Sequence, residues 1–222
     1  MRKQTEYSDA VIKRYGCYFC CCLSIAEQIV QKSIESLKEN IPEVKFFGDI
    51  TKKSVFRDSE VYKIKETLES VNSPLGGGKV IKKNMTMRDP EYAINHSVKF
   101  LTKRIIAELS VVPSLIEKYS GGANGFSHVG LTEKVKEWLL VHLRAVKQIG
   151  SDNGMTVAFW AGGTLKSAGG SSYSNCYLVD KMVTPYGNHF ILTQGKGLQT
   201  EYNPDPDVEM ISLYSRILYQ LV

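Results

Sequence analysis

A thiol at the start of a long helix is the first feature of this sequence that could perform covalent chemistry. Cys17 follows Gly16 and precedes apolar residues that recur with the helical period of about 3.6. Gly16 lets the backbone turn sharply into that helix, because it has no Cβ. The first turn of a helix presents unpaired N–H groups and the positive end of the helix dipole, and both favour an anion. The sequence therefore predicts that Cys17 has a lowered pKa and is nucleophilic.

A nucleophilic thiol needs a base, and His189 is the candidate. It heads the apolar segment 189–193, and a strand there would hold the ring rigidly at the end of a sheet. An imidazole in this role is kept in one tautomer by a third polar group. Asn203 is the first choice, because a tight turn at 195–197 would return the next strand to the neighbourhood of His189. Asp205 is the alternative to Asn203.

The order of these residues resembles that of papain-like cysteine peptidases, and looks closest to the family of bacteriocin-leader (double-glycine) processing peptidases. Stand-alone members encoded by phages or plasmids are the nearest match. The resemblance covers about residues 12–38 and 155–206. It implies a papain-like fold and a Cys17–His189–Asn203 triad that hydrolyses a peptide or related amide bond through an acyl-enzyme. It implies no metal and no organic cofactor. The family commonly has Asp as the third member, and Asn203 departs from that pattern.

A second departure concerns the oxyanion that forms during such a reaction. The family usually carries a Gln a few residues before the nucleophile, but positions 11–13 are Val, Ile and Lys, and the nearest upstream glutamine is Gln4. The backbone N–H of Cys17 would supply one donor, which leaves the second unassigned. Loss of one such donor costs about 10²–10³ in rate. The alternative hypothesis is therefore a catalytically weak or inactive papain-like module that binds a host or other partner.

The elements that must position these residues are helices first and strands later. Helical patterns cover about 17–38, 59–71, 89–109 and 132–149, and strand patterns cover 155–160, 176–180, 189–193, 198–202 and 211–221. A Gly/Ser-rich loop is expected at 162–174. This order predicts an α+β fold, with the cysteine helix packed on a C-terminal antiparallel sheet. We expect a single domain over residues 1–222, with a helical insertion at about 40–150 that enlarges the middle.

Composition narrows the classes of function. The chain has 222 residues, 43% of them hydrophobic, and a net charge of +5 whose basic residues are scattered, which favours a solvated exterior over a nucleic-acid surface. Four of its five cysteines fall at 17–22, where helical geometry prevents pairing, so reduced thiols and a cytoplasmic setting are expected. A lone Cys-x-x-Cys does not complete a zinc site. We expect no membrane segment, and a peptide or protein substrate as the partner.

Overall fold

The computed structural model describes residues 2–40, 55–71, 90–109, 133, 135–139, 141, 145–152, 159–161, 164–166, 172–173, 176–194 and 199–222. The chain divides into two compact units. One comprises residues 1–25, 57–95 and 145–222, and the other comprises residues 26–56 and 96–144. The first unit contains all the residues that the sequence proposes for chemistry. The single domain with a helical insertion stays a prediction.

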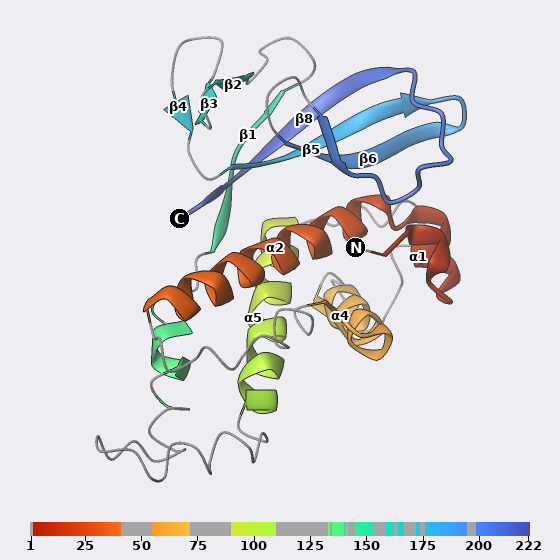
Figure 1. The fold of residues 1–222 in the computed structure, drawn as a ribbon. Helices are drawn as coiled ribbons and strands as arrows, with labels where there is room; N and C mark the ends of the chain where they lie inside the picture. The colour runs from red at the N-terminus through yellow and green to blue at the C-terminus, as the bar shows by residue number, and fades with distance from the viewer. Residues whose placement is uncertain are drawn as a thin grey trace, which may run out of the picture. The chain divides into compact units, whose positions relative to one another are not determined.

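The helices precede the strands along the chain, as Figure 1 shows. Among the described residues the helices are η1 (Gln4–Glu6), α1 (Ala10–Tyr15), α2 (Cys17–Asn40), α4 (Asp58–Val71) and α5 (Pro90–Leu109). The strands are β1 (Val146–Asp152), β2 (Phe159–Ala161), β3 (Thr164–Lys166), β4 (Ser172–Tyr173), β5 (Cys176–Thr184), β6 (Gly187–Gln194), β7 (Gln199–Tyr202) and β8 (Ser212–Leu221). The predicted α+β class is confirmed at this level.

The strands form two antiparallel sheets. The larger has five strands in the order β1-β8-β5-β6-β7, and the smaller has three in the order β2-β3-β4. In the larger sheet β6 pairs with β5 from Gly187 to Thr193, whereas β7 pairs with β6 only from Leu192 onward. The head of β6, which carries His189, is therefore next to β5 on one side and beyond the end of β7 on the other.

Two sequence-based predictions are wrong in part. The helix expected at 132–149 is seen at Glu133, 135–139 and Val141, but Val146–Asp152 form β1 and pair with β8. Pairing with a strand some 70 positions later overrides the local helical pattern there, because its ladder satisfies the backbone. The loop expected at 162–174 contains β3 and β4. Of the strand expected at 155–160, only Phe159 and Trp160 lie inside the described residues.

Gly16 joins α1 to α2 because no side chain fits there. Asp9 caps α1 by accepting the N–H groups of Val11 and Ile12, and the Gly16 N–H bonds to the Ile12 carbonyl at 2.8 Å. A Cβ at residue 16 would lie 2.5 Å from the Ile12 carbonyl oxygen. The φ of Gly16 is −85°, which any residue adopts. Close approach, and not backbone freedom, is thus the reason for glycine at this junction.

The first turns of α2 pack on the strands through aromatic side chains. The Tyr18 ring stacks on Phe190 of β6, with centroids 4.5 Å apart, and its hydroxyl hydrogen-bonds to that of Tyr219 on β8. Tyr18, Tyr219 and Phe19 are all buried. These contacts fix the start of α2 against β6 and β8 and so place Cys17 relative to the sheet.

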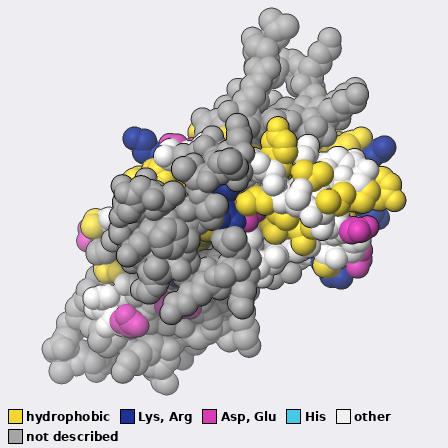
Figure 2. Space-filling model, turned by 90° about the horizontal axis from the view of Figure 1, so that it is seen from above, with side chains coloured by type: hydrophobic (Ala, Val, Ile, Leu, Met, Phe, Trp, Pro, Cys, Tyr) yellow, Lys and Arg dark blue, Asp and Glu magenta, His cyan; other side chains and the backbone are white. Residues whose placement is uncertain are grey.

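Large apolar side chains remain exposed where β5 turns into β6. Tyr186 lies in that turn, and Ile211 donates its N–H to the Val183 carbonyl beside it; both side chains are exposed. Figure 2 shows a face of the molecule on which hydrophobic side chains gather. Within the described part of the chain, no helix combines the length and the apolar character needed to cross a membrane.

Candidate active site

His189 and Asn203 form a direct hydrogen bond, although they come from different segments of the sheet. His189 is near the start of β6 and only 5% exposed, and Asn203 directly follows β7. The distance between His189 Nε2 and Asn203 Oδ1 is 2.7 Å. Tyr202 pairs with Leu192, and this register brings residue 203 toward the head of β6. The predicted return of the chain to His189 is therefore seen for Asn203.

The hydrogen bonds around Asn203 determine the tautomer of His189. The Asp205 N–H, which can only donate, bonds to Asn203 Oδ1 at 3.0 Å, so the atom facing the imidazole is the carboxamide oxygen. An oxygen that accepts there requires a proton on His189 Nε2. In the neutral imidazole Nδ1 then carries the lone pair. Asn203 thus leaves Nδ1 as the basic nitrogen.

Cys17 is buried near the backbone of Phe190, the residue that follows His189. The backbone groups of Phe190, of Tyr18 and of Cys17 itself favour its thiolate and so act to lower its pKa. One turn further along α2, the Cys21 thiol donates to the Phe190 carbonyl at 3.5 Å. The start of α2 therefore runs along the stretch of β6 that β7 leaves unpaired.

Burial changes the acid–base properties of both groups in opposite directions. It raises the pKa of the Cys17 thiol above 9.0, and the three backbone hydrogen bonds, which favour the thiolate, only reduce that rise. The predicted lowering of the Cys17 pKa is therefore wrong for the resting molecule. Burial also lowers the pKa of His189 below 6.5, against the opposing effects of the Asn203 hydrogen bond and of the Asp205 charge. Near pH 7 the thiol and the imidazole are both neutral.

Asp205 is the third polar group at this place, but not as the partner of the imidazole. Its negative charge acts to raise the pKa of both Cys17 and His189. One of its oxygens, Oδ1, is buried and has no hydrogen-bond partner. Asn203 thus holds the position next to His189 that the sequence left open between the two residues, and Asp205 acts on both groups by charge.

Gln4 is a residue of this site whose place the sequence did not indicate. It is only 4% exposed, its N–H donates to the Pro204 carbonyl at 2.7 Å, and its Nε2 donates to the Lys13 carbonyl at 3.1 Å. Its Oε1 is buried without a hydrogen-bond partner. Pro204 stands between Asn203 and Asp205, so Gln4 lies beside the segment that orients His189.

A direct hydrogen bond between the Cys17 thiol and the imidazole is not among the contacts of the described residues. The structure brings Cys17 to the backbone of Phe190 and joins His189 to Asn203, and the Asp205 charge reaches both. Catalytic hydrogen bonds between a thiol and an imidazole often form or tighten only when substrate binds.

The remaining cysteines are buried and chemically quieter. All five thiols are free of disulfides, and burial raises the pKa of Cys21, of Cys22 and, to about 11, of Cys176. Among the residues that the structure describes, no three His, Cys, Asp or Glu side chains are arranged to hold a metal ion.

No protein-family model, curated protein or solved structure matches the chain. What the fold and the site define is therefore a class: an α+β protein with a helix that carries a thiol at its first residue, beside an antiparallel sheet that carries a histidine–asparagine pair.

Proposed function

We propose that the protein is a cysteine hydrolase of the papain-like kind, acting on a peptide or related amide bond. The observation that carries the proposal is the His189–Asn203 hydrogen bond, with Cys17 against the next residue of the same strand. A neutral imidazole whose Nε2 is tied to an amide oxygen leaves Nδ1 free to take a proton, which is what a buried neutral thiol requires.

The reaction proceeds by two acyl transfers. The Cys17 proton moves to His189 Nδ1 as the sulfur attacks the carbonyl carbon of the substrate, and a tetrahedral oxyanion forms. The oxyanion collapses, the C–N bond breaks, and the amine leaves with the proton from His189. Water then gives a proton to His189 and attacks the thioester, and the acid is released as the Cys17 thiol recovers its proton. Asn203 stabilises the imidazolium in both halves.

Gln4 is the proposed second donor to the oxyanion, beside the Cys17 N–H. Its Nε2 carries two hydrogens, and the Lys13 carbonyl accepts only one of them. Gln4 is buried, its backbone N–H is fixed on the Pro204 carbonyl, and its side chain is fixed on the Lys13 carbonyl. This assignment supplies the group that the sequence lacks at positions 11–13, and it makes Gln4→Ala a specific test, with an expected loss of about 10²–10³ in acyl transfer.

The proposal is tested with two reagents, only one of which forms an oxyanion when it reacts with the thiol. Acylation by p-nitrophenyl acetate passes through an oxyanion, whereas alkylation by iodoacetamide is a displacement at a saturated carbon. We expect both reactions at Cys17 in the parent, neither in Cys17→Ala, and a loss of at least about 10³-fold in acylation for His189→Ala. Cys22→Ala is the matched control, because its thiol is buried on the same helix. A parent acylated no faster than Cys17→Ala would contradict the proposal.

A second candidate is a binding module that keeps this arrangement without turnover. The observation that favours it is the burial of the thiol, which is 9% exposed and has a raised pKa. This hypothesis predicts that Cys17 reacts with iodoacetamide no faster than Cys20–Cys22 at neutral pH. The hydrolase hypothesis predicts preferential alkylation of Cys17, assisted by His189.

A further inference from the structure

The segment that carries Gln4 is held by polar contacts to a helix far away in the sequence. We call residues 2–9 the N-terminal strap. Its only regular structure is the single turn η1, and Gln4 is the first residue of that turn. The strap meets the site through Gln4, whose N–H bonds to the Pro204 carbonyl, and through the Arg2 carbonyl, which accepts the Tyr202 hydroxyl at 2.7 Å.

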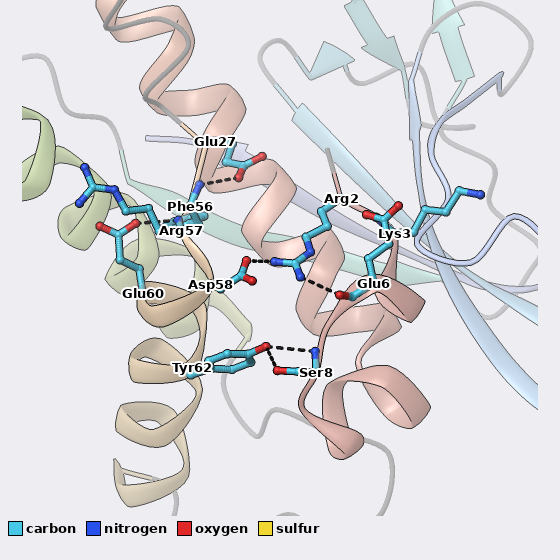
Figure 3. Close-up of polar contacts among 10 residues, drawn as sticks. All are labelled: Arg2, Lys3, Glu6, Ser8, Glu27, Phe56, Arg57, Asp58, Glu60 and Tyr62. Carbon is cyan, nitrogen blue, oxygen red and sulfur yellow. Dashed lines mark hydrogen bonds and ion pairs between the residues drawn. The ribbon is translucent and has the colours of Figure 1, made fainter.

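Three side chains of α4 bind the strap at its two ends. Figure 3 shows Asp58 at the first turn of α4 paired with the Arg2 guanidinium, and the Tyr62 hydroxyl against Ser8. The Ser8 N–H also donates to that hydroxyl, at 3.1 Å. One turn further on, Lys65 Nζ lies 2.8 Å from Asp9 Oδ2. The three α4 residues are spaced by about one helical turn, so they face the strap from one side of the helix.

Arg2 also makes contacts with other residues of the strap. One guanidinium nitrogen donates to the Glu6 carbonyl at 2.6 Å, and the guanidinium carbon lies 4.3 Å from the centre of the Tyr7 ring. Arg2 therefore contacts Glu6 and Tyr7 at the end of η1, and its ion pair with Asp58 joins this part of the strap to α4. Gln4 lies between Arg2 and Glu6 in the sequence, and its side chain is held by the hydrogen bond from Nε2 to the Lys13 carbonyl, whereas its Oε1 is buried without a partner.

We propose that α4 acts as a latch for the N-terminal strap, and that Asp58, Tyr62 and Lys65 are positioning residues for Gln4. This inference rests on the proposed function, in which Gln4 donates to the oxyanion. None of the three need touch the substrate. They fix the strap at positions 2, 8 and 9, and a displacement of about 1 Å of a reacting or stabilising group can cost about 10²-fold in rate.

The test again compares acylation by p-nitrophenyl acetate with alkylation by iodoacetamide. Asp58→Asn, an exposed position, is expected to slow acylation by no more than about fivefold, because exposed ion pairs are weak. The triple variant Asp58→Asn, Tyr62→Phe, Lys65→Met is expected to approach the loss of about 10²-fold or more seen on removing an oxyanion donor. Alkylation, which forms no oxyanion, is expected to stay within about twofold of the parent in every latch variant.

Two further variants separate positioning from general loosening. Exchange of the charges, Arg2→Asp with Asp58→Arg, is expected to restore acylation relative to Asp58→Arg alone. In a Gln4→Ala background the latch variants are expected to cause no additional loss, because residues that act through one group are not additive. Glu133→Gln, which removes an exposed ion pair with Lys136 elsewhere, is the control for charge removal.

The outcomes are distinct from those that test the hydrolase itself. If the parent is not acylated at Cys17, the proposed function fails. If the parent is acylated and the triple variant is acylated equally fast, the latch fails and the hydrolase stands. The latch is likewise overturned if alkylation falls in parallel with acylation, or if the losses add to that of Gln4→Ala.

Discussion

The two sides of the candidate site are built in different ways. The imidazole side, His189 with Asn203, is assembled by the register of neighbouring strands and completed by a 2.7 Å hydrogen bond. The thiol side, Cys17, is placed by a helix start that packs on β6 and β8 through Tyr18. Burial acts on both, yet it raises the pKa of the thiol and lowers that of the imidazole. In such a site the thiol and the imidazole are both neutral before the reaction, so the proton must move from Cys17 to His189 as the sulfur attacks the substrate.

The largest effect is expected on the imidazole side, from the loss of the group that orients it. Asn203→Ala removes the acceptor of the Nε2 proton, so the tautomer with a basic Nδ1 is no longer selected, and acylation should fall by about 10²–10⁴-fold. Asn203→Asp keeps an acceptor oxygen and should retain more of the rate. Asn188→Ala, an exposed position on β6 next to His189, is the control. Equal rates for Asn203→Ala and the parent would show that Asn203 does not orient the base.

On the thiol side the largest effect is expected in stability. Gly16→Ala places a Cβ 2.5 Å from the Ile12 carbonyl oxygen and 2.9 Å from its Cα, so the junction of α1 and α2 must shift. Overpacking of this kind costs about 1–3 kcal/mol in the free energy of unfolding. Chemical denaturation of the variant beside Glu39→Ala, an exposed position of α2, measures it. A free energy unchanged from that of the parent would mean that the junction has room for a side chain.

A smaller effect is expected in how the free energy of unfolding depends on pH, and it comes from His189. The pKa of His189 is lower in the folded chain than its ordinary value of 6.5, so the unfolded chain binds the proton more readily. Stability from this group is complete above pH 6.5 and is lost as the pH falls through the folded pKa, by at most about 1.4 kcal/mol per pH unit. His189→Gln should flatten that part of the curve, as urea denaturation between pH 4 and 8 would reveal. His96, whose pKa burial also lowers, contributes equally in both proteins.

The smallest effect is expected from Asp205, whose negative charge acts to raise the pKa of both Cys17 and His189. Its removal in Asp205→Asn takes away a charge that disfavours the Cys17 thiolate, so the alkaline rise of iodoacetamide alkylation at Cys17 should move to lower pH. The pKa of His189 should fall further, because the same charge favours the imidazolium. A profile that stays in place would place the Asp205 carboxylate too far away to act on the thiol.

Local patterns in the sequence were sufficient for the elements on which the site stands. The period of apolar residues after Gly16 predicted α2, and Pro90 at the first position of a helix predicted the start of α5. The β-forming segments 176–180 and 189–193 predicted β5 and β6. These features depend on near neighbours in the chain, for which propensity and periodicity carry the information.

Non-local packing decided what those patterns could not. The segment 146–149 reads as the end of a helix but pairs with β8, because ladder hydrogen bonds to distant residues outweigh local preference. The pKa of Cys17 is raised because the surrounding side chains exclude water, an effect that no spacing in the sequence contains. Gln4 likewise meets Pro204 through a contact between residues 200 positions apart, which no local pattern in the sequence predicts. The sequence alone thus determines the types of the candidate reacting groups. Their protonation states and their neighbours depend on burial and on long-range contacts, which only the folded chain establishes.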